Sequence, residues 1–282
     1  MNMKNKWRFI QSDVYSSAEN MAIDEAILLA HSEGKVPPTL RFYEWEPATL
    51  SIGYFQKSEE IDLDAAKERG IGFVRRQTGG RAVLHDQELT YSMIVSEDYP
   101  GLPKTVNEAY RVLSQGLLFG FQSLDLKAEM VNLATEEEKQ KYEAASSSAC
   151  FDSPSWYELV VEGRKIAGSA QTRQKGVVLQ HGSILLDMDI DLLFDLLQYS
   201  NTKVKERLKQ SFVKKAVAIN DLRRDLFLEP VSLSDVNTAF KEGISKGLGI
   251  DLEDGQLTSY ELELVDKLVK EKYGNDEWNF RK

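Results

Sequence analysis

Residues 71–95 read IGFVRRQTGGRAVLHDQELTYSMIV, and this stretch decides the fold class. Ile71 to Arg75 predicts a strand that runs into Gly79-Gly80, and Ala82 to Leu84 and Leu89 to Val95 predict the next two strands. Glycines after a strand remove the Cβ, so the backbone there can approach a ligand and present its N–H groups. Taken alone, the paired glycines are equally typical of an ordinary tight turn.

The flanking sequence predicts further strands first and helices afterwards. Strands are expected at residues 7–15, 39–45, 49–54, 156–161, 165–172 and 177–186. Helices are expected from Ser16 or Ser17 to Gly34 and at residues 62–69, 107–121, 191–199, 234–248 and 258–273. This order indicates an α+β fold with a mixed or mostly antiparallel sheet, helices on its faces and a helical C-terminal end.

The composition excludes several classes of function. The chain carries 35 basic and 45 acidic residues, a formal net charge of −10, which argues against a general nucleic-acid binder. One cysteine and three histidines give no metal-ligand spacing, so no metal is expected. The N-terminus lacks the pattern of a signal peptide and every apolar run is too short to span a membrane. We therefore expect a cytoplasmic enzyme that acts on neither nucleic acid nor membrane.

The single cysteine, Cys150, lies among small and polar residues in SSSACFDSP, residues 146–154, which predicts a loop. A thiol there is a candidate nucleophile, because a nearby cation would favour its thiolate form. A hairpin of residues 156–161 with 165–172 would return Lys165 to that loop, so Lys165 is the candidate cation. The alternatives are an incidental free thiol and an exposed lysine in a turn.

Three blocks of sequence together resemble one family. They are RRQTGGRAVLHD at residues 75–86, GRKIAGSAQ at residues 163–171, and QHGS at residues 180–183. Their order and spacing resemble those of the biotin/lipoate protein ligase and octanoyltransferase superfamily, over roughly Pro38 to Leu248. The resemblance implies a biotin/lipoate protein ligase-like catalytic domain over residues 1–250, and residues 251–282 are then expected to form a helical C-terminal extension.

The position of the cysteine selects a branch of this superfamily. Lipoate ligases activate a free acid with ATP and need no catalytic cysteine, whereas octanoyltransferases use a cysteine and a lysine. The common octanoyltransferases carry the cysteine after the lysine block, whereas here Cys150 precedes Lys165. That order resembles the second, Gram-positive type of octanoyltransferase. A related amidotransferase also has a loop cysteine but lacks the histidine of the His-Asp pair, so His85 favours the octanoyltransferase.

The resemblance implies a reaction and a site. Cys150 would take an octanoyl group from octanoyl-acyl carrier protein as a thioester and pass it to a lysine of a lipoyl domain, with the glycine-cleavage H protein as the expected acceptor. No cofactor is required. Lys165 would stabilise the thiolate. The expected substrate-binding residues are Arg76, Gly79, Gly80, His85, Gly168, Ser169, Ala170, His181 and Gly182.

Four alternatives stay open at this point. An ATP-dependent lipoate ligase would share the fold and the glycine block, and an amidotransferase would move the group between lipoyl domains. A cysteine hydrolase built on Cys150 and His181 would release the acid to water, and a lipoyl-protein binding module would form no acyl-enzyme. Recruitment of an acidic carrier is expected to use basic residues near the site, namely Arg75, Arg76, Arg81, Arg164, Arg173 and Lys175, rather than the cluster at residues 203–215.

Overall fold

The computed structural model describes residues 5–132 and 157–281. Its centre is a six-stranded sheet with the strand order β10-β11-β6-β2-β1-β12. The strands are β1 (Lys6–Tyr15), β2 (Thr39–Trp45), β6 (Glu88–Ser96), β10 (Ala167–Gln174), β11 (Val177–Leu185) and β12 (Asp251–Asp254). β1 runs parallel to β2 and β12, whereas the β2-β6, β6-β11 and β10-β11 pairs are antiparallel. The predicted α+β fold with a mixed sheet is confirmed.

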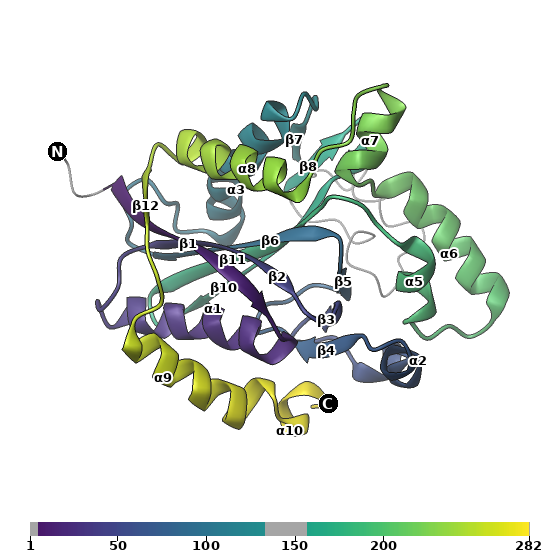
Figure 1. Cartoon of the computed structure of the whole chain (residues 1–282), viewed down its shortest axis with the longest axis horizontal. Helices are drawn as coiled ribbons and strands as arrows, with labels where there is room; N and C mark the ends of the chain where they lie inside the picture. Colours follow the sequence, from purple (N-terminus) through teal and green to yellow (C-terminus); the bar gives the residue numbers. More distant parts are fainter. Residues whose placement is uncertain (1–4, 133–156, 282) are drawn as a thin grey trace.

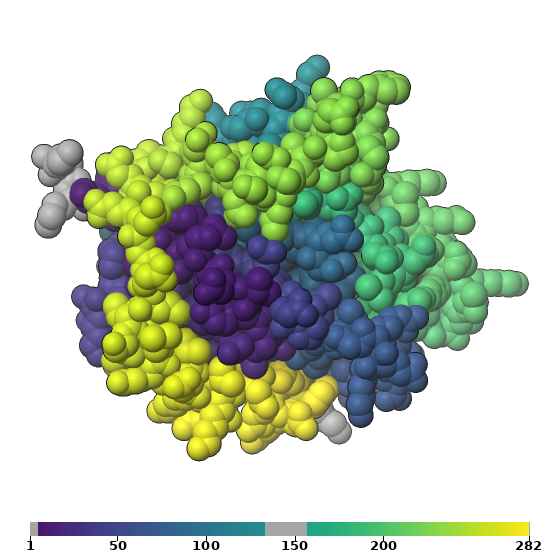
Figure 2. All heavy atoms as spheres, viewed as in Figure 1, coloured from purple at the N-terminus to yellow at the C-terminus, as the bar shows by residue number. Residues whose placement is uncertain are grey.

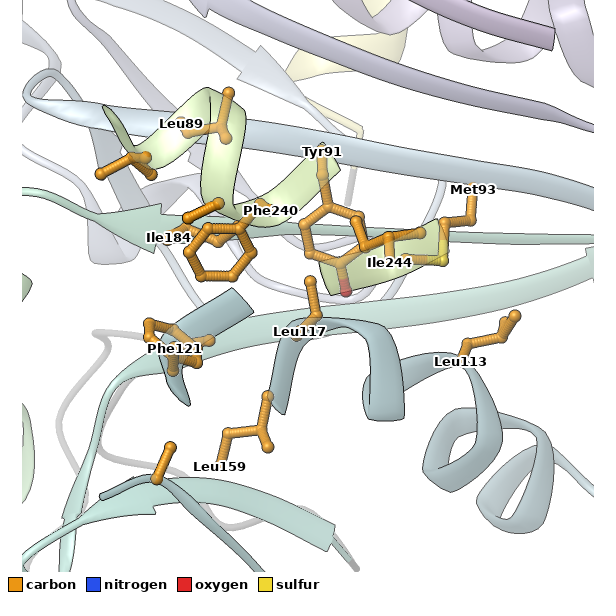
Figure 3. Close-up of a cluster of buried hydrophobic side chains, with 14 of the residues drawn as sticks. Leu89, Tyr91, Met93, Leu113, Leu117, Phe121, Leu159, Ile184, Phe240 and Ile244 are labelled. Atoms are coloured by element: carbon orange, nitrogen blue, oxygen red, sulfur yellow. The ribbon is translucent and has the colours of Figure 1, made fainter. Parts of the chain in front are cut away.

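Helices cover both faces of this sheet (Figure 1). On one face lie α3 (Val106–Ser123) and α8 (Leu233–Leu248), and on the other lies α1 (Ser17–Ser32) with α9 (Ser259–Leu268) packed against it. Successive residues of a strand point to opposite faces, so the apolar side chains of β6 at Leu89, Tyr91 and Met93 meet α3 and α8. Figure 3 shows this core, in which Phe121 and Phe240 pack edge to face at 4.8 Å between ring centroids.

A small second sheet carries the glycine block. It has the order β4-β3-β5, with β3 (Thr49–Ile52) parallel to β4 (Gly72–Arg75) and antiparallel to β5 (Val83–His85). Residues 76–82, which join β4 to β5, are called the glycine turn below. Because β4 and β5 both pair with β3, the ends of the glycine turn are fixed.

A third sheet and further helices complete the described chain. Its order is β7-β8-β9, built from β7 (Glu129–Asn132), β8 (Tyr157–Val161) and β9 (Arg164–Lys165), all antiparallel. The remaining helices of the described chain are η2 (Ser58–Glu60), α2 (Leu63–Glu68), α5 (Ile190–Asp195), the longer α6 (Thr202–Lys215), α7 (Ile219–Asp225), the π-helix η4 (Val269–Tyr273) and α10 (Asp276–Asn279). In the part of the chain that is described, no helix has the length and apolarity needed to cross a membrane.

The segment after residue 250 is helical over most of its length, but it begins with β12, an edge strand of the central sheet. In the space-filling view its residues border those of β1 and α1 (Figure 2). The buried ion pair between Arg8 of β1 and Glu261 of α9, at 2.6 Å, ties the segment to the sheet. The domain boundary at residue 250 stays a prediction, but these contacts join the two predicted parts in one body.

Candidate active site

Two rows of polar side chains cross the central sheet on the face that α1 covers. Strand register aligns Arg41, Ser92 and His181 in one row, and places Tyr43, Thr90 and Ser183 in the next. Each row takes one residue from β2, β6 and β11, because alternate residues of paired strands share a face. The sheet thus presents an apolar face to α3 and α8 and a polar stripe to α1.

Asp24 of α1 is the hub of the first row. Its carboxylate accepts hydrogen bonds from Arg41 Nη1 at 2.9 Å, Ser92 Oγ at 2.8 Å, Tyr43 Oη at 2.9 Å and His181 Nδ1 at 3.2 Å. Burial alone raises the pKa of Asp24, but the hydrogen bond from His181 and the charge of Arg41 outweigh it, so the pKa lies below its usual value. Asp24 is therefore a buried carboxylate with four donors.

His181 joins this hub to the glycine turn. Its Nε2 lies 2.7 Å from Thr78 Oγ1. Burial lowers the pKa of His181, against an opposing effect of Asp24, so the imidazole is neutral near pH 7. Since Asp24 is ionised and only accepts, Nδ1 of His181 carries the proton and Nε2 accepts from the Thr78 hydroxyl.

His85 is held in the same way. Its Nδ1 lies 2.6 Å from the Glu88 carboxylate and its Nε2 lies 2.7 Å from Ser51 Oγ. The imidazole stacks on Trp45, with ring centroids 4.3 Å apart and an interplanar angle of 17°. The two histidines thus repeat one arrangement of carboxylate, imidazole and hydroxyl. Both hydroxyls, of Ser51 and Thr78, are buried, so neither is exposed as a nucleophile.

Arg76 fixes the glycine turn from within. Its Nη1 donates to Ser51 Oγ at 2.6 Å, and its Nη2 donates to the carbonyls of Gly79 at 3.2 Å and Arg81 at 3.0 Å. Gly80 has a φ of +98°, which favours glycine. A Cβ at position 53 would stand only 2.0 Å from the Gly80 carbonyl oxygen, so Gly53 also is required for the turn to pack against β3.

A cavity lies between these groups and the sheet. Seven of the nine predicted substrate-binding residues line it, namely Arg76, His85, Gly168, Ser169, Ala170, His181 and Gly182. Gly79 and Gly80 do not line it; they lie in the middle of the glycine turn, where Gly79 is partly exposed and Gly80 is exposed. The three sequence blocks, which lie between residues 75 and 183, therefore meet around one cavity. The role of each residue in binding stays a prediction.

Of the two predicted catalytic residues, Cys150 and Lys165, only Lys165 lies within the described part of the chain. Cys150 lies outside the described residues. Lys165 ends β9 and is only 7% exposed, with Nζ 3.0 Å from Glu158 Oε2 on β8. It is therefore not an exposed turn residue. Gly168, on the cavity wall, follows three positions along the chain.

Comparison with known proteins decides the family. The family model of the lipoyl protein ligase A/B catalytic domain matches residues 16–245. Octanoyltransferase LipM of Brevibacillus brevis is 62% identical over 98% of this chain and 99% of that protein, and the LipM of Bacillus subtilis is 56% identical over 99% of each.

The chain belongs to the LipM octanoyltransferases. Membership makes it an acyltransferase. Among solved structures, the bipartite lipoate protein ligase of Thermoplasma acidophilum has a TM-score of 0.80 and 27% identity over 98% of this chain and 96% of that chain. Lipoate-protein ligase A bound with ATP has a TM-score of 0.76 and 27% identity over 99% of each. The fold is thus that of the lipoate ligases, as the sequence blocks predicted.

In this LipM-family site, several lining residues were missed by the sequence analysis. Met21, Tyr43, Trp45 and Ser183 line the cavity, and Asp24 lies behind it. Ser183 follows directly after the His-Gly pair that was selected, so its place in the third block was a usable signal. Asp24 sits inside the apolar run of an ordinary helix and carried no such signal.

Several of the basic residues expected to recruit a carrier are buried or already bind other groups of the protein. Arg75 and Arg76 are 1% and 5% exposed, so the expectation that they form a docking surface is wrong. Arg164 pairs with Glu162 at 3.2 Å and Asp225 at 3.1 Å. Arg173 donates to carbonyls of the loop before α3, including that of Pro103 at 3.1 Å.

Proposed function

We propose that this chain transfers an octanoyl group from octanoyl-acyl carrier protein to the lipoyl-domain lysine of an acceptor, the glycine-cleavage H protein, through a thioester on Cys150. The observation that carries the proposal is the cavity that gathers residues of all three blocks in a chain 62% identical to a LipM octanoyltransferase. The reaction belongs to lipoate biosynthesis. The enzyme works without ATP or metal, because a thioester donor already supplies an activated acyl group.

The acyl chain occupies the cavity in this proposal. Met21, Val83, Ala170 and the two glycines of its wall offer apolar surface. Burying a methylene stabilises a complex by about 0.8 kcal/mol, so a tail of this length contributes on the order of 5 kcal/mol of binding free energy.

One wall hydroxyl is available for the polar end of the acyl group. Seven other polar side chains of the wall each have a hydrogen-bond partner. Among the described residues, Ser183 Oγ has none, and Ser183 is 1% exposed. A buried polar group without a partner is uncommon, so we assign the Ser183 hydroxyl to the acyl carbonyl.

Lys165 supports the thiolate in the proposed mechanism. A buried ammonium needs a compensating charge, which Glu158 supplies. The ion pair holds Nζ at the end of β9, three residues before Gly168 of the cavity wall. The thiolate of Cys150 then attacks the donor carbonyl, the carrier thiolate leaves and takes a proton, and the acyl group stays on sulfur.

The second half-reaction regenerates the thiol. The ε-amine of the acceptor lysine attacks the acyl-Cys150 carbonyl, an amide bond forms, and the C–S bond breaks. The amine gives up one proton, and the cysteine leaves as the thiolate that Lys165 favours. Water competes poorly if the site is occupied by the acceptor lysine, which distinguishes the transferase from a hydrolase.

Intact-protein mass spectrometry after mixing with octanoyl-acyl carrier protein tests the proposal. We expect one added octanoyl group, removed by hydroxylamine and absent from Cys150→Ser, and that variant should not modify the H protein. Lys165→Ala should shift the midpoint of thiol alkylation against pH upward, whereas Lys175→Ala, in the exposed turn after β10, serves as the control. Full activity of Cys150→Ser would reject the mechanism.

The structural similarity to a lipoate-protein ligase bound with ATP favours a second candidate function, that of an ATP-dependent ligase. An ATP-dependent ligase would modify the H protein from free octanoate and ATP, and would tolerate Cys150→Ser. The same mass assay run with free octanoate and ATP, in place of the acylated carrier, separates the two activities directly.

A further inference from the structure

The glycine turn has no helix or sheet of its own, yet its backbone is held in a defined place beside the cavity. Thr78 is the link. Its carbonyl accepts from the Tyr54 N–H at 2.8 Å, and its hydroxyl meets His181 Nε2 at 2.7 Å. The turn is thus attached to β11 of the central sheet by one side-chain hydrogen bond across the cavity wall.

The direction of that hydrogen bond is set on the far side of the ring. The ionised carboxylate of Asp24 can only accept hydrogen bonds, and its oxygens already accept them from Arg41, Ser92 and Tyr43. His181 must therefore present Nδ1–H to Asp24, which leaves Nε2 with a lone pair. A hydroxyl donor at Thr78 matches that lone pair. An Nε2–H ring would instead leave the Asp24 oxygen facing a lone pair at 3.2 Å.

We propose that Asp24 is a positioning residue of this enzyme, which acts through His181 and Thr78 to hold the glycine turn against the acyl cavity. Asp24 itself lines no part of the cavity. Its carboxylate fixes the tautomer of His181, the tautomer fixes the direction of the Thr78 hydroxyl, and the hydroxyl fixes the turn. The role in catalysis rests on the acyl transfer proposed above, whereas the tautomer does not.

A second chain of the same kind supports this role. Glu88, His85 and Ser51 repeat the order of carboxylate, imidazole and hydroxyl, and Ser51 accepts from Arg76, whose guanidinium binds the carbonyls of the turn. Two of the side-chain hydrogen bonds that hold the turn, those of Thr78 and Arg76, therefore depend on a histidine whose Nδ1 faces a buried carboxylate. Such carboxylate partners orient imidazoles in metal sites by the same physics.

The first test reads the tautomer in the parent protein and needs no activity. Nitrogen-15 NMR of histidine-labelled protein separates the Nδ1–H and Nε2–H forms of a neutral imidazole, and His31→Gln, His85→Gln and His181→Gln assign the three rings. We expect His181 in the Nδ1–H form near pH 7.5. An Nε2–H ring at His181 overturns the proposal whether or not the chain transfers octanoyl groups.

The second test uses a matched pair at Thr78. Thr78→Val removes the hydroxyl with little change of shape, and Thr78→Ser keeps it. Loss of the anchor should lower kcat by about tenfold to 100-fold, the range that small misplacement of a site produces, with a smaller change in KM for the acyl carrier. Thr78→Ser should stay within about threefold of the parent, a limit far below that loss.

The third test uses Asp24→Asn. Thermal unfolding checks that each variant is folded. An asparagine amide can donate to Nδ1, so it should convert His181 toward the Nε2–H form and lower kcat as Thr78→Val does. If Asp24→Asn fails to fold, the Thr78 pair decides. Equal rates for Thr78→Val and Thr78→Ser, or a loss confined to KM, would show that the hydrogen bond has no positioning role.

Discussion

Ser183 occupies a position where the protein forms no hydrogen bond of its own within the described residues, although the side chain is buried. Removing its hydroxyl should therefore leave the free energy of unfolding unchanged. If the hydroxyl binds the acyl carbonyl, Ser183→Ala should slow acylation of Cys150 by about tenfold, since one donor to a developing oxyanion is worth at least that much. Rapid-quench mass spectrometry of the acyl-enzyme measures the rate.

The matched control is Ser169→Ala on the same wall. Ser169 Oγ accepts a hydrogen bond from Tyr91 at 2.7 Å, so loss of its hydroxyl breaks a hydrogen bond within the protein, which loss of the Ser183 hydroxyl does not. That substitution should lower the melting temperature and affect acylation less than Ser183→Ala does. The opposite ranking of the two acylation rates would remove Ser183 from the site.

At the level of single residues, motif spacing predicted the part of the site that lies on three blocks, and it missed the part set by strand register. Arg76, His85 and His181 were selected because each stands in a block. Asp24 reaches them only because α1 crosses the sheet above Arg41, Ser92 and His181, a consequence of tertiary packing. No local pattern reports such a crossing.

Among the elements, α3 and α8 approach each other unusually closely, and glycines explain why. Gly116 and Gly120 of α3 face Gly243 and Gly247 of α8. A Cβ at position 243 would stand 2.4 Å from the backbone nitrogen of Gly120, and one at position 247 would stand 2.7 Å from the Gly116 Cα. These helix backbones touch, and Phe121 and Phe240 fill the space beside the contact.

Gly243→Ala should therefore destabilise the protein, although alanine is the better helix former by about 1 kcal/mol. The clash involves backbone on both sides, so the helices must separate and lose core packing, which costs about 1–3 kcal/mol when a core is overfilled. Urea unfolding measures the change. Glu242→Ala, one position away and exposed, is the control and should change stability little. A more stable Gly243→Ala protein would contradict the close crossing.

Elements with a local signal were predicted well. The helix expected from Ser16 or Ser17 begins at Ser17 after a capping box of Ser16 and Glu19, and the helix expected from residue 258 begins as α9 after a capping box of Thr258 and Glu261. β7 and β12 were missed. β12 reads DLED and lies at the sheet edge, so it has neither an apolar run nor alternation, and its partner β1 lies at the opposite end of the chain.

For the whole molecule, Arg75 is the point where the C-terminal end meets the glycine block. Its guanidinium donates to the carbonyls of Asn279 at 3.0 Å and Arg281 at 3.3 Å on one side, and to those of Gly53 at 3.0 Å and Gln56 at 2.6 Å on the other. All of these acceptors are backbone oxygens. The planar fork of arginine suits this pattern, and a lysine ammonium cannot reach both sides at once.

A double-mutant cycle tests this link. Arg75→Lys and truncation after Gly274 should each lower the melting temperature. The truncation also removes the stacking of Phe280 on Phe73, at 5.4 Å between centroids, so the single losses differ. The two changes share one interaction, so the truncation should cost less in the Arg75→Lys protein than in the parent, by at least about 0.5 kcal/mol. Strict additivity would mean that Arg75 acts independently of the C-terminal end.

Stability of the whole chain should fall on mild acidification because His181 is buried and His31 is partly buried. Burial lowers the pKa of His181 and of His31 below the unfolded value of 6.5. Above about pH 7.5 both states are neutral and the contribution is complete. As the pH falls through 6.5, these histidines become protonated in the unfolded chain but stay neutral in the folded chain. The free energy of unfolding therefore decreases, by up to about 1.4 kcal/mol per pH unit for each fully buried histidine. Asp24 adds nothing in this window, because its pKa lies below 3.8 and its contribution is lost only at lower pH.

Urea unfolding at pH 8.0, 7.0, 6.0 and 5.5 measures this slope. His181→Gln should be less stable than the parent at pH 8.0, because it loses the hydrogen bonds to Asp24 and Thr78, yet its slope between pH 7 and 5.5 should be shallower. His31→Gln is the matched comparison, since His31 is only partly buried and accounts for the smaller share of the slope. A parent slope of zero, or a slope that neither substitution reduces, would show that folding does not lower the pKa of His181, and would contradict the neutral buried ring on which the link from Asp24 to the glycine turn depends.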